Sequence, residues 1–454
     1  MSGADPRVRR AERMPDGTPR VPVAIVGAGA CGLTAALMLR NADIDCVLLE
    51  RDASPQGSTA LSSGFIPAAG TAVQRAAGVH DDSAARFAAD IQAKSHGRAA
   101  PHLVAAYTAA IAPALDTLQQ RHGFAFELLD GFLYPGHSVR RMHTLPQRTG
   151  AALMAALQAA VDSAGATLLT HARVRVLWCS ANDRVLGVTV ERPDGRDEHL
   201  ACDALLLACN GFGGNAALVR EHLPAFRDAV FAGHIGNDGS AIAWGRALDA
   251  RLADLSGCQG HGSWAIPHGV LITWALMTEG GIQVNAGGRR FHDETRGYSE
   301  AAVDVLAQPG GVAWDVFDTR LLELARRFPD FVSAESAGAV RRAADAPALA
   351  QVIGCAAATL GDTLASTRLT PPYHAIRVTG ALFHTQGGLD VDAHARVLRN
   401  DGMPLPNLLA AGGAARGVSG DSASGYLSGN GLLSAVAGGF IAARTAAAQL
   451  RGAA

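Results

Sequence analysis

A glycine-rich turn near the start of the chain constrains the fold more than any other feature. Residues 21–26 form a short apolar run that predicts a buried strand, and residues 33–39 have the periodicity of a helix. Between them, Gly27, Gly29 and Gly32 fill the glycine positions of a G-x-G-x-x-G turn. Because residues 45–50 predict a second buried strand, the segment reads as a β-α-β unit and predicts an α/β fold.

The spacing of this turn indicates what it can hold. Gly27 allows the tight turn, Gly29 lets a pyrophosphate approach the backbone, and Gly32 lets the helix pack closely on the strand. The free N–H groups at the helix N-terminus face the phosphates. Glu50 ends the second strand, where a carboxylate accepts hydrogen bonds from ribose hydroxyls. The motif predicts a bound dinucleotide but does not distinguish NAD from FAD.

Composition excludes several other classes of protein. A chain of 454 residues, 48% hydrophobic, can build more than one core, so we expect about two or three domains. A net charge of −2 lacks the excess of positive charge that is typical of nucleic-acid binding, so the expected partners are small molecules. The seven cysteines include no C-x-x-C pair, so we expect reduced, buried thiols and no metal or iron–sulfur site.

The rest of the chain divides into segments that differ in their predicted secondary structure. Strand-like and glycine-bearing segments occupy residues 21–255 and return in residues 373–454, which predicts one discontinuous domain. Residues 256–372 contain longer helical stretches, such as residues 346–360, and indicate an inserted capping domain. Residues 1–20 are expected to form a flexible tail. We predict no membrane span and a cytoplasmic location.

Four further stretches carry a resemblance to a known family. The most specific of them matches the pattern V-N-x-x-G-x-R-F-x-x-E. The stretches are residues 57–64, 207–215, 281–294, and 384–389 together with 408–413 and 429–431. On these residues the chain resembles the flavoprotein family of soluble fumarate reductases, succinate dehydrogenase flavoprotein subunits and ketosteroid dehydrogenases.

The resemblance implies a Rossmann-like FAD-binding domain of the glutathione-reductase type, with an α+β capping domain inserted into it. FAD is the implied cofactor, and it is expected to be non-covalent because residues 57–64 contain no histidine. Near residues 429–431, glycines and a helix N-terminus would face the flavin pyrimidine ring. The residues expected to bind FAD are Gly27, Gly29, Ala30, Gly32, Glu50, Arg51, Ser58, Thr59, Ser63, Gly64, Val174, Asn210, Gly211, Asp238, Gly413, Ser428, Gly429, Asn430, Leu432 and Leu433.

The same resemblance suggests catalytic groups. In the members that reduce dicarboxylates, an arginine after the R-F-x-x-E pattern delivers a proton and two histidines orient the substrate. The corresponding residues here are Arg296, His261 and His384. A guanidinium is a poor proton donor unless the site is dry, because its pKa is very high. The alternative to this catalytic role is that Arg296 anchors an anion or pairs with Glu294.

Departures from the fumarate pattern predict a different substrate. Trp274 and Met277 stand where those enzymes have a glutamate and an arginine, and Tyr426 stands where they have a carboxylate-binding arginine. Without these charged groups a site holds two carboxylates less well. We therefore include Tyr426 among the catalytic residues and predict a flatter, more apolar substrate. Trp274 and Met277 could also be packing residues, since they lie three residues apart in a helix-compatible stretch.

These features predict an FAD-dependent oxidoreductase that adds or removes hydrogen across a C–C bond next to a carbonyl or carboxylate. Its substrate would be an enone, a ketosteroid-like compound or a monocarboxylate, and its electron donor or acceptor is unidentified. One alternative is a flavin oxidase or hydroxylase that uses oxygen. Another is a flavin-bearing redox or assembly protein without a substrate of its own.

The lack of a histidine in residues 57–64 leads to a direct test. The purified protein should be yellow, and precipitation by acid or heat should release the FAD because no covalent link holds it. Chromatography of the supernatant and absorbance of the washed pellet measure the two fractions. Flavin that stays on the precipitated chain would contradict the non-covalent assignment.

Overall fold

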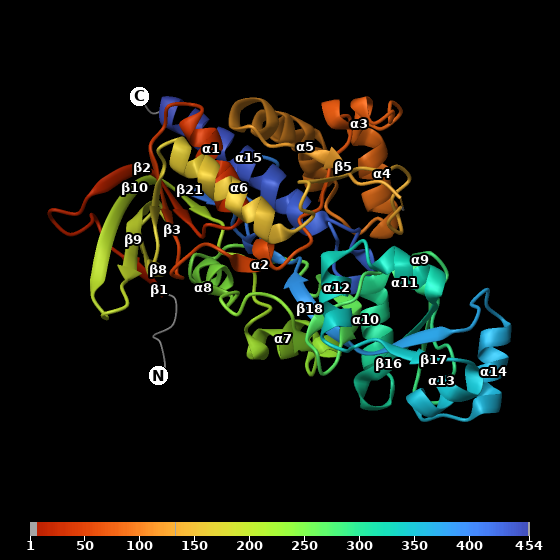
Figure 1. Cartoon of the computed structure of the whole chain (residues 1–454). Helices are drawn as coiled ribbons and strands as arrows, with labels where there is room; N and C mark the ends of the chain where they lie inside the picture. Colours follow the sequence, from red (N-terminus) through yellow and green to blue (C-terminus); the bar gives the residue numbers. More distant parts are fainter. Residues whose placement is uncertain (1–6, 132, 453–454) are drawn as a thin grey trace.

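Two large sheets organise the chain (Figure 1). The computed structural model describes residues 7–131 and 133–452. Over these residues the first sheet has nine strands, with β2 (Arg20–Val26) parallel to both β10 (Asp197–Leu207) and β3 (Cys46–Leu49) at its centre. Its other strands are β1 (Arg7–Arg10), β7 (Thr167–Leu169), β8 (Arg173–Cys179), β9 (Val185–Glu191), β20 (Arg396–Leu398) and β21 (Pro404–Ala410).

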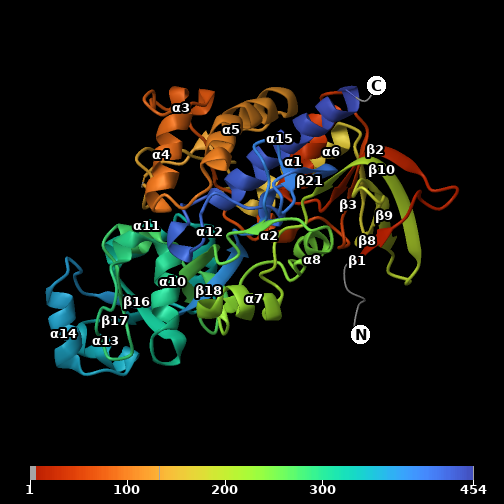
Figure 2. The ribbon, with the colours of Figure 1, turned by 180° about the vertical axis from the view of Figure 1, so that it is seen from behind.

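Long helices pack beside this sheet. α1 (Ala30–Arg40) packs against α15 (Asn430–Gly452) and α6 (Gly150–Ser163), and α15 also packs against α5 (Pro101–His122) (Figures 1 and 2). Small residues allow α1 and α15 to approach closely, because a Cβ at Gly439 would lie 2.4 Å from the carbonyl oxygen of Cys31. The buried faces of these helices and the sheet form the larger hydrophobic core.

α15 is also apolar along much of its length. Over the described residues it is the one helix that is long and apolar enough, by length and composition, to cross a membrane. Its most apolar window is 61% buried inside the protein. The core helix of a globular protein passes the same test, and packing against α1 and α5 accounts for this apolarity.

The second sheet has a hydrophobic core of its own. β18 (Tyr373–Thr385) is its central strand and pairs antiparallel with β13 (Cys258–Ala265) and β16 (Val312–Asp318). We call this sheet and the helices around it the cap, which lies to one side of the first sheet (Figure 2). Its remaining elements are β11 (Val230–Phe231), β14 (Val270–Leu271), β15 (Ile282–Val284), β17 (Arg341–Ala343), α9 (Ala275–Thr278), α10 (Tyr298–Leu306), α11 (Thr319–Ala325), α12 (Pro329–Ser336), α13 (Ala346–Ile353) and α14 (Ala357–Ala365).

Short elements complete the fold. A small sheet of β4, β5 and β6 lies next to α3 and α4, and β12 pairs with β19. The short elements are α2 (Gly57–Ala60), α3 (Ala72–Ala76), α4 (Ala84–Lys94), α7 (Ala216–His222), α8 (Ser240–Ala247), β4 (Ile66–Pro67), β5 (Glu127–Leu128), β6 (Met142–Thr144), β12 (Leu252–Ala253), β19 (Gly388–Leu389) and the 3-10 turns η1 (Pro224–Phe226), η2 (Glu294–Arg296), η3 (Pro309–Gly311), η4 (Gly412–Ala414) and η5 (Ala423–Gly425).

The structure corrects the expected tail and one expected helix. Residues 7–10 form β1, which pairs in parallel with β8, so this part of the tail is ordered by sheet pairing; residues 1–6 lie outside the described residues. The helix expected over residues 346–360 is two helices, α13 and α14. The chain leaves α13 at Gly354, whose φ of 86° is left-handed and suits glycine.

The expected limits of the capping domain also differ from the sheet pairing. β18 starts after the expected limit at residue 372, yet it is the central strand of the cap sheet. β11 lies before residue 256 and pairs with β18. Both strands join the cap through long-range hydrogen bonds, which local sequence patterns do not report.

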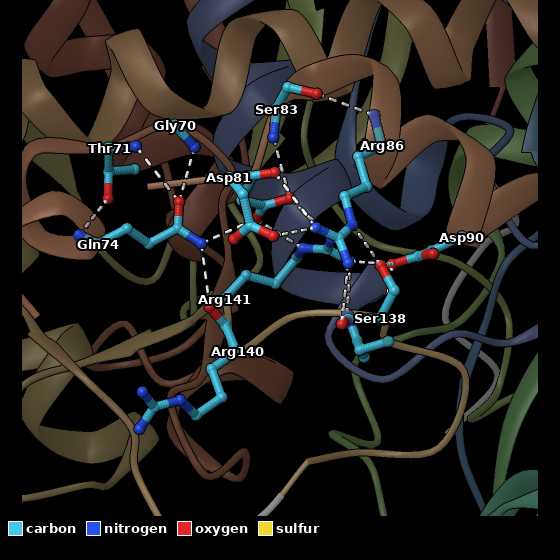
Figure 3. Close-up of polar contacts among 12 residues, drawn as sticks. Gly70, Thr71, Gln74, Asp81, Ser83, Arg86, Asp90, Ser138, Arg140 and Arg141 are labelled. Carbon is cyan, nitrogen blue, oxygen red and sulfur yellow. Dashed lines mark hydrogen bonds and ion pairs between the residues drawn. The ribbon is translucent and has the colours of Figure 1, made fainter. Parts of the chain in front are cut away.

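A buried arginine ties the small sheet to α4 (Figure 3). Arg141 is 1% exposed, and its Nη2 donates a hydrogen bond to Asp82 Oδ1 at 2.9 Å. Asp90 on α4 accepts a bond from Arg141 Nη1, and His137 Nδ1 lies 3.2 Å from the same nitrogen. A buried guanidinium is tolerated only when such partners offset its lost hydration, so this cluster holds its segments in one arrangement.

Two neighbouring aspartates provide a test of this cluster. Asp82→Asn should destabilise the protein by about 3–5 kcal/mol, because it leaves a buried guanidinium short of a carboxylate. Asp81→Asn is the control: Asp81 pairs with Arg86 at the surface, where its side chain is 76% exposed, and the substitution should have little effect. Urea denaturation followed by circular dichroism measures both variants. Equal effects would contradict the role given to Arg141.

Candidate functional site

A long cavity extends from the edge of the first sheet into the cap. It starts at the carboxyl ends of β2, β3 and β10, where a parallel α/β sheet places its ligands. One wall consists of the glycine turn, residues 49–52, residues 57–65 and the first turns of α15. The other wall consists of side chains from the cap, on β13, β18, α10 and the first turn of α12.

The glycine turn forms a cradle for phosphate. α1 has no acidic residue in its first turn, and its N-cap residue Gly29 has no side chain to cap it; Thr59 Oγ1 accepts the N–H of Ala30 at 3.2 Å, so the remaining N-terminal N–H groups and the dipole favour an anion. Gly27 has a φ of +101°, and a Cβ there would lie 2.6 Å from the carbonyl oxygen of Ala208. Gly29 faces the cavity, where a Cβ would meet only Thr59 Oγ1, at 3.7 Å. The space in front of Gly29 therefore suits the pyrophosphate of a dinucleotide.

Charged residues cluster at the end of the cavity next to β3. Glu50 accepts hydrogen bonds from the backbone N–H of Ala28 and of Asp52, both at 3.0 Å. Arg51 donates to Asp238 Oδ2 at 3.2 Å, and Arg173 lies 3.6 Å from the same oxygen. This polar end of the cavity fits the ribose and adenine of a dinucleotide. The hydrogen bond expected between Glu50 and the ribose hydroxyls stays a prediction.

A second helix N-terminus meets the cavity further along. α15 begins at Asn430 with no acidic residue in its first turn, and Gly429 precedes it with a φ of +86°. Ser428, Gly429 and Leu432 line the cavity, together with Gly413 after β21. The first turn of α15 can thus stabilise negative charge on a reduced flavin ring. The N-terminus of α1 at the pyrophosphate and the N-terminus of α15 at the flavin ring together fit FAD.

Most of the residues expected to bind FAD line this cavity. Four do not. Gly32 and Gly211 provide close packing, since a Cβ would lie 2.0 Å from Gly27 O or from Thr385 Oγ1 respectively. Asn430 is fully buried and Leu433 packs in the larger core. The residues that line the cavity are Gly27, Gly29, Ala30, Glu50, Arg51, Ser58, Thr59, Ser63, Gly64, Val174, Asn210, Asp238, Gly413, Ser428, Gly429 and Leu432.

His261 on β13 lies within an aromatic cluster at the cap end. Its ring stacks on Tyr298, with centroids 4.7 Å apart, and on Phe383, with centroids 5.5 Å apart. The backbone N–H of Ser263 donates to its Nδ1 at 3.1 Å, which leaves the proton on Nε2. Burial lowers the pKa of His261 to about 3. His261 is therefore a neutral hydrogen-bond donor at physiological pH.

A chain of side chains sets the tautomer of His384 on β18. Asn430 Nδ2 donates to Ser419 Oγ at 3.0 Å, and Ser419 Oγ donates to Gln386 Oε1 at 2.7 Å. Gln386 Nε2 then donates to His384 Nδ1 at 3.0 Å, a shorter contact than the 3.2 Å from Nδ1 to the carbonyl oxygen of Thr385. We therefore assign the ring proton to Nε2. Burial lowers the pKa of His384 to about 4, so it too is neutral.

Three tyrosines share this end of the cavity. Tyr298 lies between the other two, with ring centroids 6.2 Å from Tyr426 and 6.5 Å from Tyr134. The Tyr426 hydroxyl accepts a hydrogen bond from the backbone N–H of Gly431 at 3.4 Å. Burial raises the pKa of Tyr426, and hydrogen bonds from the backbone at the start of α15 partly offset that rise. Tyr426 thus connects the cap end to the first turn of α15.

The structure does not bring Arg296 to the cavity. Its side chain is 53% exposed and lies 3.6 Å from Asp304, while Glu294 pairs with Arg290 instead. The alternative by which Arg296 pairs with Glu294 is therefore wrong. Gly297, with a φ of +129°, turns the backbone into α10, so Tyr298 lines the cavity and Arg296 does not.

Trp274 and Met277 stand where the fumarate-reducing members have charged residues, and the structure places them in different environments. Trp274 lines the cavity, and its Nε1 donates to the carbonyl oxygen of Glu294 at 3.3 Å. Met277 packs in the cap core. No sequence-based expectation included two other residues of this lining, Tyr134 and Tyr298. Tyr298 follows the R-F-x-x-E pattern closely, which is a usable signal, whereas no motif marks Tyr134.

Comparisons with known proteins agree with this geometry. A family model described as FAD binding domain matches residues 22–432, so the chain belongs to this family. A probable fumarate reductase of Shewanella frigidimarina is 26% identical over 447 residues, which cover 94% of this chain and 74% of that protein. A 4-oxocyclohexanecarboxylate 2-dehydrogenase of Sinomonas cyclohexanicum is 26% identical, with 96% of this chain and 95% of that protein covered.

A solved structure shares the fold over nearly the whole chain. It is a 3-ketosteroid-Δ4-(5α)-dehydrogenase from Rhodococcus jostii in complex with 4-androstene-3,17-dione, with a TM-score of 0.78 at 23% identity; the match covers 97% of this chain and 99% of that one. The predicted fold class, family resemblance and FAD cofactor are confirmed by these findings. The chain is an FAD-dependent oxidoreductase.

Substitutions at two glycines of the turn distinguish loss of FAD binding from loss of folding. Gly29→Val should fold but lose FAD, because its extended backbone accepts a side chain that then occupies the phosphate space. Gly32→Val should fail to fold, because its Cβ would lie 2.0 Å from Gly27 O. Flavin content per chain and circular dichroism measure the two effects. A normal FAD content in Gly29→Val would show that the phosphates lie elsewhere.

Proposed function

We propose that this flavoenzyme adds or removes hydrogen across a C–C bond next to a carbonyl in a flat, largely apolar substrate. The observation that carries the proposal is the lining of the cap end of the cavity. Among the described residues there, aromatic rings and two neutral histidines face the cavity, and no arginine or lysine does. Such a lining favours a ring with a ketone over a dicarboxylate.

The two histidines are suited to polarise the carbonyl. FAD, when bound, supplies the acceptor or donor of the hydride. His261 and His384 each carry a proton on Nε2 and stay neutral, so each can donate a hydrogen bond to a carbonyl oxygen as negative charge develops on it. Their other nitrogens are held by Ser263 and Gln386, which keeps both donors in a fixed orientation.

Tyr426 is the group that we assign to proton exchange at the substrate carbon. Its hydroxyl lies at the first turn of α15, where backbone N–H bonds lower its pKa against the effect of burial. Tyr298, whose ring contacts Tyr426, positions the substrate ring between the two walls. Arg296, exposed and paired with Asp304, has no part in this proposal.

The compounds named for two similar proteins support a cyclic ketone as the substrate. One acts on 4-oxocyclohexanecarboxylate and the other was solved with a steroid dione. By contrast, fumarate carries two carboxylates that need charge-assisted hydrogen bonds of roughly 1.5–3 kcal/mol each. Losing two such bonds would weaken fumarate binding by roughly two to four orders of magnitude.

The expected specificity can be measured on the reduced enzyme. After anaerobic photoreduction, 2-cyclohexen-1-one should reoxidise the flavin, whereas fumarate should do so negligibly because no cationic side chain faces it. Absorbance of the oxidised flavin in a stopped-flow instrument gives both rates. Brisk reoxidation by fumarate together with no response to the enone would overturn the proposed function.

Two variants test the assigned residues on the same reaction. Tyr426→Phe should slow enone reduction while FAD content stays normal, because only the exchangeable proton is lost. Arg296→Ala is the control and should react like the wild type, since Arg296 lies outside the cavity. A large loss of rate in Arg296→Ala at normal FAD content would return this residue to the mechanism.

A further inference from the structure

A β-bulge in β13 lies directly next to His261. The register of β13 against β18 shifts between His261 and Trp264, which leaves Gly262 and Ser263 opposite a single residue of β18. A bulge re-aims the neighbouring side chains and interrupts the hydrogen bonds of the sheet. Because His261 lines the cavity, the groups that hold this bulge also determine where its Nε2 points.

The side chain of Gln283 on β15 holds the bulge. Its Nε2 donates to the carbonyl oxygen of Gly262 at 3.0 Å and to Ser263 Oγ at 3.1 Å. β18 and β16 lie between β13 and β15 in the order of the sheet, so this side chain joins two strands that do not pair. Gln283 Oε1 lies 2.8 Å from His292 Nε2, which sets the orientation of the amide. Gln283 is fully buried, so bulk water cannot replace these hydrogen bonds.

Asp315 on β16 is the third partner of the Gln283 amide. The distance from Gln283 Nε2 to Asp315 Oδ1 is 2.7 Å, shorter than the two contacts with the bulge. Asp315 is fully buried, and its Oδ2 has no hydrogen-bond partner within the described part of the chain. Burial raises the pKa of Asp315 to about 7, although hydrogen bonds with Gln283 and Ser263 lower it. In its neutral form Asp315 acts through the acceptor oxygen that it offers to Gln283 and not through a charge.

We propose that Gln283 and Asp315 are positioning residues for the reaction and that they act through His261. Gln283 fixes the bulge, and the bulge presents the backbone N–H of Ser263 to His261 Nδ1, which keeps the ring proton on Nε2. Asp315 holds the Gln283 amide in the orientation that this contact requires. The inference rests on the proposed function, in which His261 Nε2 donates a hydrogen bond to the carbonyl oxygen of the substrate.

The rate of flavin reoxidation by 2-cyclohexen-1-one tests Gln283. In the photoreduced holoenzyme at slightly acid pH, Gln283→Met should lower the limiting rate about tenfold to a hundredfold, because a misdirected donor stabilises the transition state less. The enone concentration that gives half of this rate should change little, since the bond from His261 strengthens mainly as charge develops on the oxygen. Gln351→Met, the same change at an exposed position of α13, is the control and should react like the wild type. FAD content and circular dichroism report whether each variant is folded.

A double-mutant cycle distinguishes positioning from a purely structural role. His261→Phe keeps a ring that can stack on Tyr298 and Phe383 but removes the hydrogen-bond donor. If Gln283 acts through His261, Gln283→Met should slow the His261→Phe enzyme by less than about twofold. If Gln283 only stabilises the cap, its substitution should slow both enzymes by the same factor, and the inference would be wrong.

Two substitutions of Asp315 test its part in the network. Asp315→Val has a similar size and suits a strand but offers Gln283 no acceptor, so it should be about as slow as Gln283→Met. Asp315→Asn offers an amide oxygen in the same place and should regain most of the wild-type rate. A rate for Asp315→Asn as low as that for Asp315→Val would overturn the role given to the neutral acid.

The outcomes separate this inference from the proposed function. If the wild type reduces the enone and Gln283→Met reduces it equally fast, the inference is wrong while the proposed function stands. If Gln283→Met does not fold, the comparison of Asp315→Val with Asp315→Asn decides the inference. If the wild type does not reduce the enone, the proposed function fails and the inference fails with it.

Discussion

The close contact between the glycine turn and the start of α1 is the constraint on which the rest of the structure depends. Gly32 has no side chain, so α1 can begin against the carbonyl oxygen of Gly27, where a Cβ would lie 2.0 Å away. That contact aims the N-terminus of α1 at the cavity. On its other side α1 packs on α15 through Gly439, so the N-terminus of α15 reaches the same cavity further along. Two helix dipoles are thereby placed along one ligand.

The cavity separates charge from hydrophobic surface along its length. At the β3 end, Glu50 is held by backbone N–H groups, and Arg51 and Arg173 share Asp238. At the cap end the lining is aromatic, and burial keeps both histidines neutral. Aromatic walls lower the local dielectric, which strengthens each hydrogen bond made to a developing charge and disfavours strongly hydrated anions.

Positioning in this site comes from buried polar side chains behind the lining. The chain from Asn430 through Ser419 and Gln386 orients His384. Behind Ser428, His137 Nε2 donates to its carbonyl oxygen at 2.9 Å, and the other ring nitrogen contacts Arg141. The buried ion pairs of Arg141 therefore connect to the loop that precedes α15. Buried hydrogen bonds thus fix both the loop before α15 and the ring of His384, which line the same cavity.

Local sequence was sufficient for the first β-α-β unit and a bound dinucleotide, because a glycine turn between a strand and a helix is a contiguous pattern whose steric requirements lie within a few residues. The choice of FAD came from the family resemblance of four stretches spread along the chain. The family motifs also pointed to His261, His384 and Tyr426, which the tertiary structure brings to one cavity. Only the tertiary structure decided that Arg296 lies outside it, since the turn at Gly297 and the pairing with Asp304 depend on how α10 packs. Likewise β1 and β18 are placed by long-range strand pairing, and Tyr134 reaches Tyr298 across more than a hundred intervening residues, a contact that no local pattern encodes.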